Sequence, residues 1–340
     1  MKKIIIILLL LGIIVGVFSI VNHCLDQKNK FSVLKEIYDS MVEVTGGKFT
    51  IGKDYNAINV VDIIKQHNTE KHVVALDEEY KIYLDKKYEA PADTSVGSFF
   101  MNKYVVTQKQ WKAVMGDNPI IVGYGTEQNN DWSRWCRKTL AHWVSFLMDT
   151  TKMQYTGVGD DYPIYYVSWS DANRFIDKLN KLSEKYEAKL KTKYKDSAEF
   201  KILVFHLPTE VQWEYAARKS RNSDTTYKDY IFSGSNTAEQ VAWFLHNSNG
   251  EVHKVGDLTP NAIELYDMSG NVFEWCADIG IRHYQTDSLL YDTRYRVLRG
   301  GSYLLDIYCS RVSYRGCGLY PNEDAPEPDI GFRLAAKIKD

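Results

Sequence analysis

Four residues in one short stretch have the types and spacing of a cation site. Asp267, Gly270, Val272 and Glu274 lie within residues 265–275, LYDMSGNVFEW, and offer two carboxylates and two backbone carbonyls. Hard cations such as Ca2+ prefer oxygen ligands, so this set predicts a calcium site. The alternative is structural, with Asp267 accepting hydrogen bonds from nearby amides and Glu274 paired with a buried arginine. Spacing alone favours the structural alternative, because Ca2+ usually takes about six to eight oxygens.

The backbone around these residues must turn sharply. Ser269-Gly270-Asn271 is a turn signal, and apolar and aromatic residues flank it on both sides. We therefore expect a buried loop whose backbone polar groups find their partners inside the fold.

Predicted helices and a strand frame this loop. Residues 99–106 have the pattern of a strand. Thr107 and Thr209 each begin a capping box, and Ser168 is suited to cap a third helix. Apolar residues at helical spacing predict the buried face of that third helix. They are Trp169, Ala172, Phe175, Ile176, Leu179 and Leu182.

The cysteines and histidines give few sites for other chemistry. The five cysteines are Cys24, Cys136, Cys276, Cys309 and Cys317, and none has CxxC or Cys/His zinc spacing. Cys309 and Cys317 are close enough in sequence to bridge if their Cα geometry permits it. The eight histidines are scattered, and Gly300-Gly301 lacks the lysine of a phosphate-binding loop. The sequence therefore gives no support to non-haem iron or nucleotide chemistry.

The N-terminus predicts export. Lys2 and Lys3 precede an uncharged run of 18 residues, from Ile4 to Val21, which is at the lower limit for a membrane-spanning helix. We favour an uncleaved signal anchor over residues 1–22, followed by a tether over residues 23–40. Signal cleavage and lipidation at Cys24 are the alternatives. Export places the domain outside the cytoplasm, in the periplasm or at the cell surface, where disulfides persist.

Length and charge limit the function classes. The chain has 340 residues and a formal net charge of -2, so the overall charge gives no argument for nucleic acid or an acidic membrane surface. A single large domain with long irregular connections suits this length.

Several motifs together carry a family resemblance. Residues 265–275 resemble the signature of the sulfatase-modifying factor family, whose founding activity is that of the formylglycine-generating enzyme. Residues 44–52, 104–107, 207–218 and 296–302 agree with the family in order, and the chain closes with Gly-Phe-Arg-Leu as family members do. The resemblance covers nearly all of residues 41–338. It implies an α+β, C-type-lectin-like fold with little regular secondary structure, and insertions near residues 54–96 and 124–160.

The family also suggests roles for individual residues. Its calcium ligands correspond to Asp267, Gly270, Val272 and Glu274, and a serine and an aromatic residue at its substrate cleft correspond to Ser302 and Phe273. Its oxygen-dependent enzymes use two cysteines that follow the Gly-Gly-Ser, and soft thiolates at close quarters suit Cu(I). Here leucines stand near the first cysteine position, and Cys309 is an uncertain match to the second. Cys309 is therefore the candidate catalytic residue, and we expect no copper site.

Two hypotheses on function follow from the resemblance. The first is a non-catalytic binding or envelope-assembly module, tethered to the membrane, whose partner is another protein or exported polypeptide. The second is an oxidoreductase that generates formylglycine on a cysteine of a sulfatase or another protein. The missing cysteine favours the first hypothesis. The tryptophans of the second insertion fit either a helix packed on the domain or a lid or partner surface.

Overall fold

The computed structural model describes most of the chain from residue 22 onward. The described residues are 22–52, 91–122, 157–195, 197, 200–219, 230–283, 289–316 and 326–339. The uncharged run of residues 4–21 and most of the two predicted insertions, 53–90 and 123–156, therefore lie outside the described residues. Within the described part, no helix combines the length and the apolar character that a membrane span needs.

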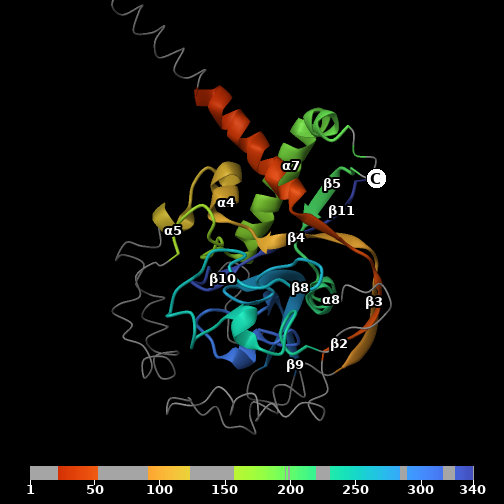
Figure 1. The fold of residues 1–340 in the computed structure, drawn as a ribbon, viewed down its shortest axis with the longest axis vertical. Coiled ribbons are helices and arrows are strands. Elements are labelled where there is room, and N and C mark those ends of the chain that lie inside the picture. Colours follow the sequence, from red (N-terminus) through yellow and green to blue (C-terminus); the bar gives the residue numbers. More distant parts are fainter. Residues whose placement is uncertain are drawn as a thin grey trace, which may run out of the picture.

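A four-stranded antiparallel sheet crosses the middle of the domain, with helices above it (Figure 1). Its strands, in spatial order, are β1 (Met41–Val44), β4 (Phe99–Val105), β11 (Arg333–Ile338) and β5 (Leu203–His206). The C-terminal strand β11 therefore lies in the centre, hydrogen-bonded to β4 on one side and β5 on the other. The strand expected at residues 99–106 is confirmed by β4.

A second sheet carries the central loop. Its three strands are β10 (Ile330–Gly331), β8 (Phe273–His283) and β9 (Leu289–Arg299), with β8 in the middle. β8 is parallel to β10 and antiparallel to β9. Two strand pairs complete the sheets: β2 (Gly47–Ile51) with β3 (Ala92–Val96), and β6 (Ala242–Trp243) with β7 (Ser269–Gly270).

The helices are few, and their starts follow local sequence signals. Thr107, Ser168 and Thr209 each cap a helix, as predicted, and each forms a complete capping box, which the sequence had predicted for Thr107 and Thr209. After residue 100, the described helices are α4 (Gln108–Met115), α5 (Pro119–Val122), α7 (Trp169–Lys193), α8 (Glu210–Arg218) and the short 3-10 turns η4 (Ala238–Gln240) and η5 (Ile307–Ser310). Mixed helices and short strands with long irregular connections agree with the α+β class expected from the sequence.

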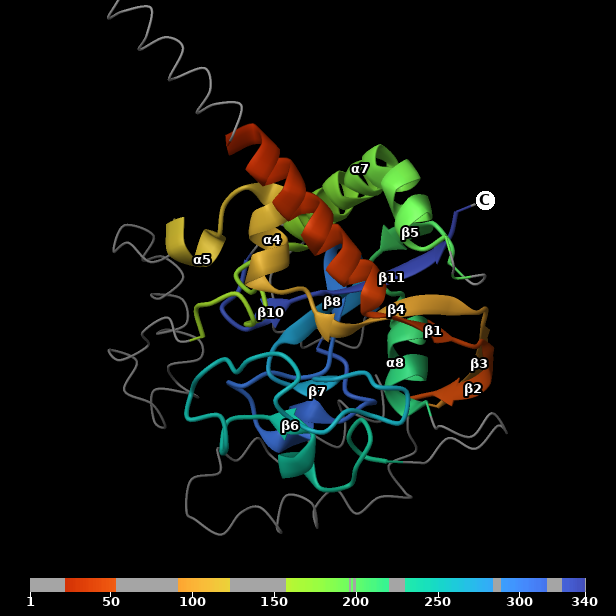
Figure 2. The same ribbon diagram turned by 45° about the horizontal axis from the view of Figure 1, so that its top comes forward.

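The expected tether is instead part of the folded domain. Residues 22–39 are helical, and this N-terminal helix buries Val33, Leu34 and Ile37 in the core. The Tyr38 hydroxyl and Ser183 Oγ of α7 are 2.7 Å apart in a buried hydrogen bond. The prediction that residues 23–40 form a polar linker outside the domain was wrong. The polar composition of this segment obscured a narrow apolar face at helical spacing. Figure 2 shows the N-terminal helix, α4 and α7 together on one side of the molecule.

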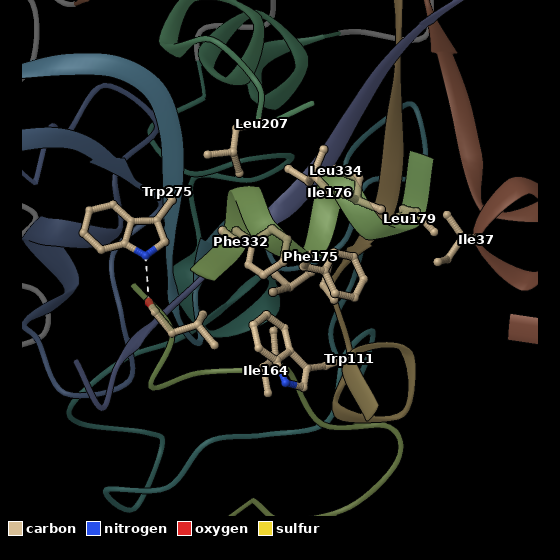
Figure 3. Packing of buried hydrophobic residues seen from close by; sticks show 14 of the residues in the cluster. Ile37, Trp111, Ile164, Phe175, Ile176, Leu179, Leu207, Trp275, Phe332 and Leu334 are labelled. Atoms are coloured by element: carbon tan, nitrogen blue, oxygen red, sulfur yellow. Dashed lines mark hydrogen bonds between the residues drawn. The ribbon is translucent and has the colours of Figure 1, made fainter. Parts of the chain in front are cut away.

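The main core joins the helices to both sheets. Trp111 of α4 stacks on Phe175 of α7 with ring centroids 5.5 Å apart, and Phe332 meets both rings edge-on. Trp275 of β8 is fully buried, and its indole N–H donates to the carbonyl of Val167 at 2.9 Å (Figure 3). This packing fixes the strand that begins directly after the central loop.

Candidate functional site

The central loop has a backbone that only certain residues can adopt. Asp267, Gly270 and Asn271 have φ of 55°, 74° and 63°, in the left-handed region. Asp and Asn are among the few non-glycine residues that enter this region readily. At Gly270 an added Cβ would lie 2.2 Å from the carbonyl oxygen of Trp243, so the β6–β7 pairing requires glycine there. The turn predicted at residues 269–271 is confirmed.

Asn271 joins three segments inside the domain. Its side chain forms two hydrogen bonds with the backbone of His253, one accepted and one donated, both at 3.1 Å. Its backbone N–H donates to Trp243, and its carbonyl accepts from the N–H of Tyr303, both at 2.8 Å. The side chain is fully buried, so these bonds satisfy polar groups that water cannot reach. The loop is buried, as predicted.

Glu274 is held by a buried arginine. Arg333 Nε donates to Oε2 at 2.9 Å, and its terminal nitrogen donates to Oε1 at 2.7 Å, in a bidentate pair. The indole N–H of Trp213 adds a bond to Oε2 at 2.8 Å. Glu274 and Arg333 are both completely buried. This is the structural alternative that the sequence left open for Glu274.

Asp267 also has a protein partner. Its Oδ2 accepts from the backbone N–H of Gly256 at 2.8 Å. Burial raises the pKa of the Asp267 carboxyl to about 6, and the hydrogen bond from Gly256 and the charge of Arg333 oppose that rise. The carboxylates of Asp267 and Glu274 thus each have partners from the protein, and a Ca2+ ion at Glu274 would have to compete with Arg333.

As arranged, this donor set fits calcium poorly. Within the described residues, no group of three or more acidic, histidine or cysteine side chains is placed to hold a metal ion. Calcium binding by Asp267, Gly270, Val272 and Glu274 stays a prediction.

A second set of buried ion pairs lies on α8. Glu214 pairs with Arg218 at 2.8 Å and with Arg299. Burial raises the pKa of the Glu214 carboxyl, but the charges of the two guanidinium groups outweigh burial and the net pKa is lowered. Glu210 pairs with Arg315 at 2.6 Å. Glu210 and Glu214 were not predicted from the sequence. Two acids four residues apart on one helix face repel each other, so their spacing on a capped helix was a signal for cationic partners.

Ser302 and Phe273, expected at a substrate cleft, are both fully buried. Ser302 Oγ donates to Asp329 Oδ2 at 2.6 Å. Phe273 packs against Tyr314, with ring centroids 6.4 Å apart. In these positions the two residues support the loops around Gly300-Gly301, and their role in lining a cleft stays a prediction.

The segment after Gly301 contains one thiol among the described residues. Leu304 is buried and Leu305 packs against the main core. Neither aliphatic side chain has an atom that could bind a metal. Cys309 lies on η5 and is partly exposed. An added Cβ at Gly301 would lie 2.6 Å from the Cys309 carbonyl oxygen, so these two residues are in close contact.

The other cysteines do not complete a described pair. Cys276 is fully buried, in a different hydrophobic cluster from Leu304, and burial raises the pKa of its thiol well above the usual value. A thiol buried in apolar surroundings in this way is inert rather than reactive. Cys136 and Cys317 lie outside the described residues, and so does the expected bridge between Cys309 and Cys317. Chemically, the site offers a rigid framework and one partly exposed thiol.

Comparison with known proteins identifies relatives along most of the chain. The family model described as "Sulfatase-modifying factor enzyme 1-like domain" matches residues 28–338. The chain is 25% identical over 274 residues to "Chaperone protein LppX" of Paenibacillus barcinonensis, covering 71% of this chain and 81% of that protein. It is 29% identical over 218 residues to the formylglycine-generating enzyme of Streptomyces coelicolor, covering 59% of this chain and 60% of the enzyme.

A third relative is named as inactive. The chain is 23% identical over 318 residues to "Inactive C-alpha-formylglycine-generating enzyme 2" of Bos taurus, covering 87% of this chain and 88% of that protein. Proteins named as enzymes, as inactive and as a chaperone are thus all similar to this chain, and similarity alone leaves its activity undecided.

Proposed function

This chain belongs to the family of sulfatase-modifying factor enzyme 1-like domains, and on that premise we propose that it is a non-catalytic binding or envelope-assembly module. Its partner is another protein or an exported polypeptide. The domain works outside the cytoplasm and is tethered to the membrane through its N-terminus.

The observation that carries this proposal is the loss of a thiol pair. After Gly300-Gly301-Ser302, Leu304 and Leu305 pack into or against the core, and Cys309 is the one cysteine of the described segment. Two soft thiolates at close range suit Cu(I), and a lone thiol binds it far more weakly. The described residues therefore do not fit the copper site that the family's oxygen-dependent enzymes use.

Retention of the framework without the thiol pair fits a binding role. The buried pair of Glu274 and Arg333 and the hydrogen bonds of Asn271 stabilise the loops of the domain. The relative named as a chaperone matches over 81% of its own length, which supports a function based on contact with another polypeptide.

Copper binding tests whether the domain lacks the oxidation chemistry of the family's enzymes. The full chain is titrated with Cu(I) against a colorimetric chelator, and loss of a substrate peptide thiol is followed with and without oxygen. We expect no tight Cu(I) binding and no oxygen-dependent loss of the thiol. The proposal is wrong if both appear and Cys309→Ser abolishes both, while Cys24→Ser, at an exposed thiol on the N-terminal helix, leaves them intact.

The tether has its own test. The uncharged run from Ile4 to Val21 follows two lysines, which favours insertion with the domain outward. Fractionation of cells combined with protease accessibility should place the chain in the membrane fraction with its domain open to external protease. A soluble chain protected inside the cytoplasm would contradict the tether.

The second candidate function is formylglycine generation. The similarity to the enzyme of Streptomyces coelicolor favours it, although the match spans 60% of that enzyme's length. For this function a second thiol would have to join Cys309, and Cys317 is the nearest in sequence. Copper binding that is abolished equally by Cys309→Ser and Cys317→Ser would support this alternative.

A further inference from the structure

A groove rich in lysine lies where the N-terminal helix, α4 and α7 meet. Its volume is about 390 Å³. The apolar side of its lining is made by Val114 and Met115 at the end of α4 and by Leu182 of α7. Four lysines form the remaining lining with Gln27; they are Lys30, Lys178, Lys181 and Lys185. Apolar and cationic groups therefore face the same space.

The lysines of α7 form a stripe along one face of the helix. Lys178, Lys181 and Lys185 are three and four residues apart, which places them on the same side, and all three are exposed. Lys178 and Lys181 form no ion pair with the described residues. Lys30 pairs with Asp26 at 2.8 Å, and the Lys185 ammonium donates to the side-chain oxygen of Gln27, so phosphate would add to or replace these partners. The net charge of -2 averages over the whole chain and conceals this local positive surface.

The groove is fixed to the start of the chain. The Tyr186 hydroxyl of α7 donates to the carbonyl and the side-chain oxygen of Gln27, at 3.0 and 2.7 Å. Gln27 is five residues after Asn22, where the described helix begins, a rise of about 7.5 Å along the helix. If the run of residues 4–21 spans the bilayer, the groove therefore lies at the depth of the headgroups or just above them.

We propose that this groove binds the phosphate headgroups of anionic phospholipids in the same membrane. The inference rests on the tether of the proposed function. Lysine ammonium groups close to an anionic surface attract it strongly, and the attraction declines within about one Debye length, about 8–10 Å. Contact through the lysines would hold the domain in one orientation on the bilayer, with the opposite face free for a partner.

Lysine reactivity in lipid nanodiscs tests this contact with the full chain. The chain is placed in discs of phosphatidylcholine alone or with phosphatidylglycerol added, and each lysine's acetylation by a water-soluble reagent is measured by mass spectrometry. We expect Lys30, Lys178, Lys181 and Lys185 to react at least about fivefold more slowly in the anionic discs only, since each bound lysine contributes about fivefold to the affinity. The exposed Lys254, on the irregular loops before the central loop, should be unchanged.

A matched pair of variants separates specific from general charge effects. The triple variant K178Q/K181Q/K185Q should remove the protection of Lys30 in anionic discs. The triple variant K191Q/K193Q/K195Q makes the same charge change at the far end of the same segment and should leave Lys30 protected. Circular dichroism of both variants establishes that the domain is folded.

The other outcomes overturn the proposal. Equal protection in neutral and anionic discs would mean mere proximity to the bilayer, and protection by inorganic phosphate in neutral discs would mean a site for a free anion. Protection in native membranes but not in anionic discs would mean that a protein occupies the groove. If residues 4–21 do not anchor the chain, the chain will not enter neutral discs, and this outcome can be told apart from failure of the lysine contact. In that case flotation with anionic vesicles still measures whether the lysines bind anionic lipid.

Discussion

Removal of Arg333 should strongly destabilise the domain. The side chain is fully buried and makes two bonds with Glu274. It also donates to the carbonyls of Asn102 and Lys103, each at 2.9 Å, and of Tyr266 at 2.7 Å. Arg333→Met would leave the buried carboxylate of Glu274 and these three carbonyls without the guanidinium donors, and of the three carbonyls that of Lys103 keeps a second donor, the N–H of Tyr266.

The size of the effect follows from those lost partners. Breaking a buried ion pair by removing one member costs about 3–5 kcal/mol, and each carbonyl left unsatisfied adds to this. We therefore expect Arg333→Met to lower the free energy of unfolding by about 4 kcal/mol or more. A domain of ordinary stability has about 5–15 kcal/mol in total, so the variant should unfold at much lower urea concentration.

Two comparisons make this measurement decisive. Arg174→Met removes an arginine of the same size from an exposed pair with Asp171 and should cost less than about 1 kcal/mol. Adding Glu274→Gln to Arg333→Met should recover stability, because the double variant no longer buries an unpaired carboxylate. The reasoning is refuted if Arg333→Met matches Arg174→Met within error, or if the double variant is no more stable than Arg333→Met alone.

Three further predictions concern the loop, pH and calcium. Gly270→Ala should lower the free energy of unfolding by more than about 2 kcal/mol in urea, because φ is positive there and the new Cβ would meet the Trp243 carbonyl. The control Gly97→Ala, at a position with open space around it, should lower it by less than about 1 kcal/mol. Burial lowers the pKa of His206, so protonation of this side chain destabilises the folded state. The free energy of unfolding should therefore fall as the pH drops from about 6.5 through the pKa of His206 in the folded state. His206→Gln should reduce this pH dependence in urea titrations, and an unchanged pH dependence would contradict the assignment. If Ca2+ binds the predicted set, EDTA should lower the Tm of the wild type but not of Asp267→Ala, and an equal Tm with and without EDTA would rule the site out.

Local signals in the sequence predicted much of the framework. The helix caps at Thr107, Ser168 and Thr209 and the turn at residues 269–271 depend on neighbours within a few positions, and all are present. The alternative reading of Glu274 as the partner of a buried arginine was also available from residue type alone. Each of these features is decided by hydrogen bonds that the local chain can largely satisfy.

The long-range pairing could not be predicted in the same way. Arg333 and Glu274 are 59 positions apart, and Arg299 and Glu214 are 85 apart, so the sheet topology determines which carboxylate each arginine meets. The N-terminal helix was predicted as a polar linker because only a few of its residues are apolar. Their contribution to the core is evident only once α7 packs against them. The lysine groove was missed for the same reason, since it exists only where three separate helices meet.

Co-expression with a sulfatase that carries a Cys-x-Pro-x-Arg motif tests the proposed function most directly. Mass spectrometry of the purified sulfatase reports whether the motif cysteine is still a thiol or has become the formylglycine aldehyde. The absence of a described thiol partner for copper chemistry at Cys309 predicts that the cysteine remains unmodified, while a known formylglycine-generating enzyme converts it in parallel cultures. Conversion by this chain that is lost in Cys309→Ser would contradict the non-catalytic account.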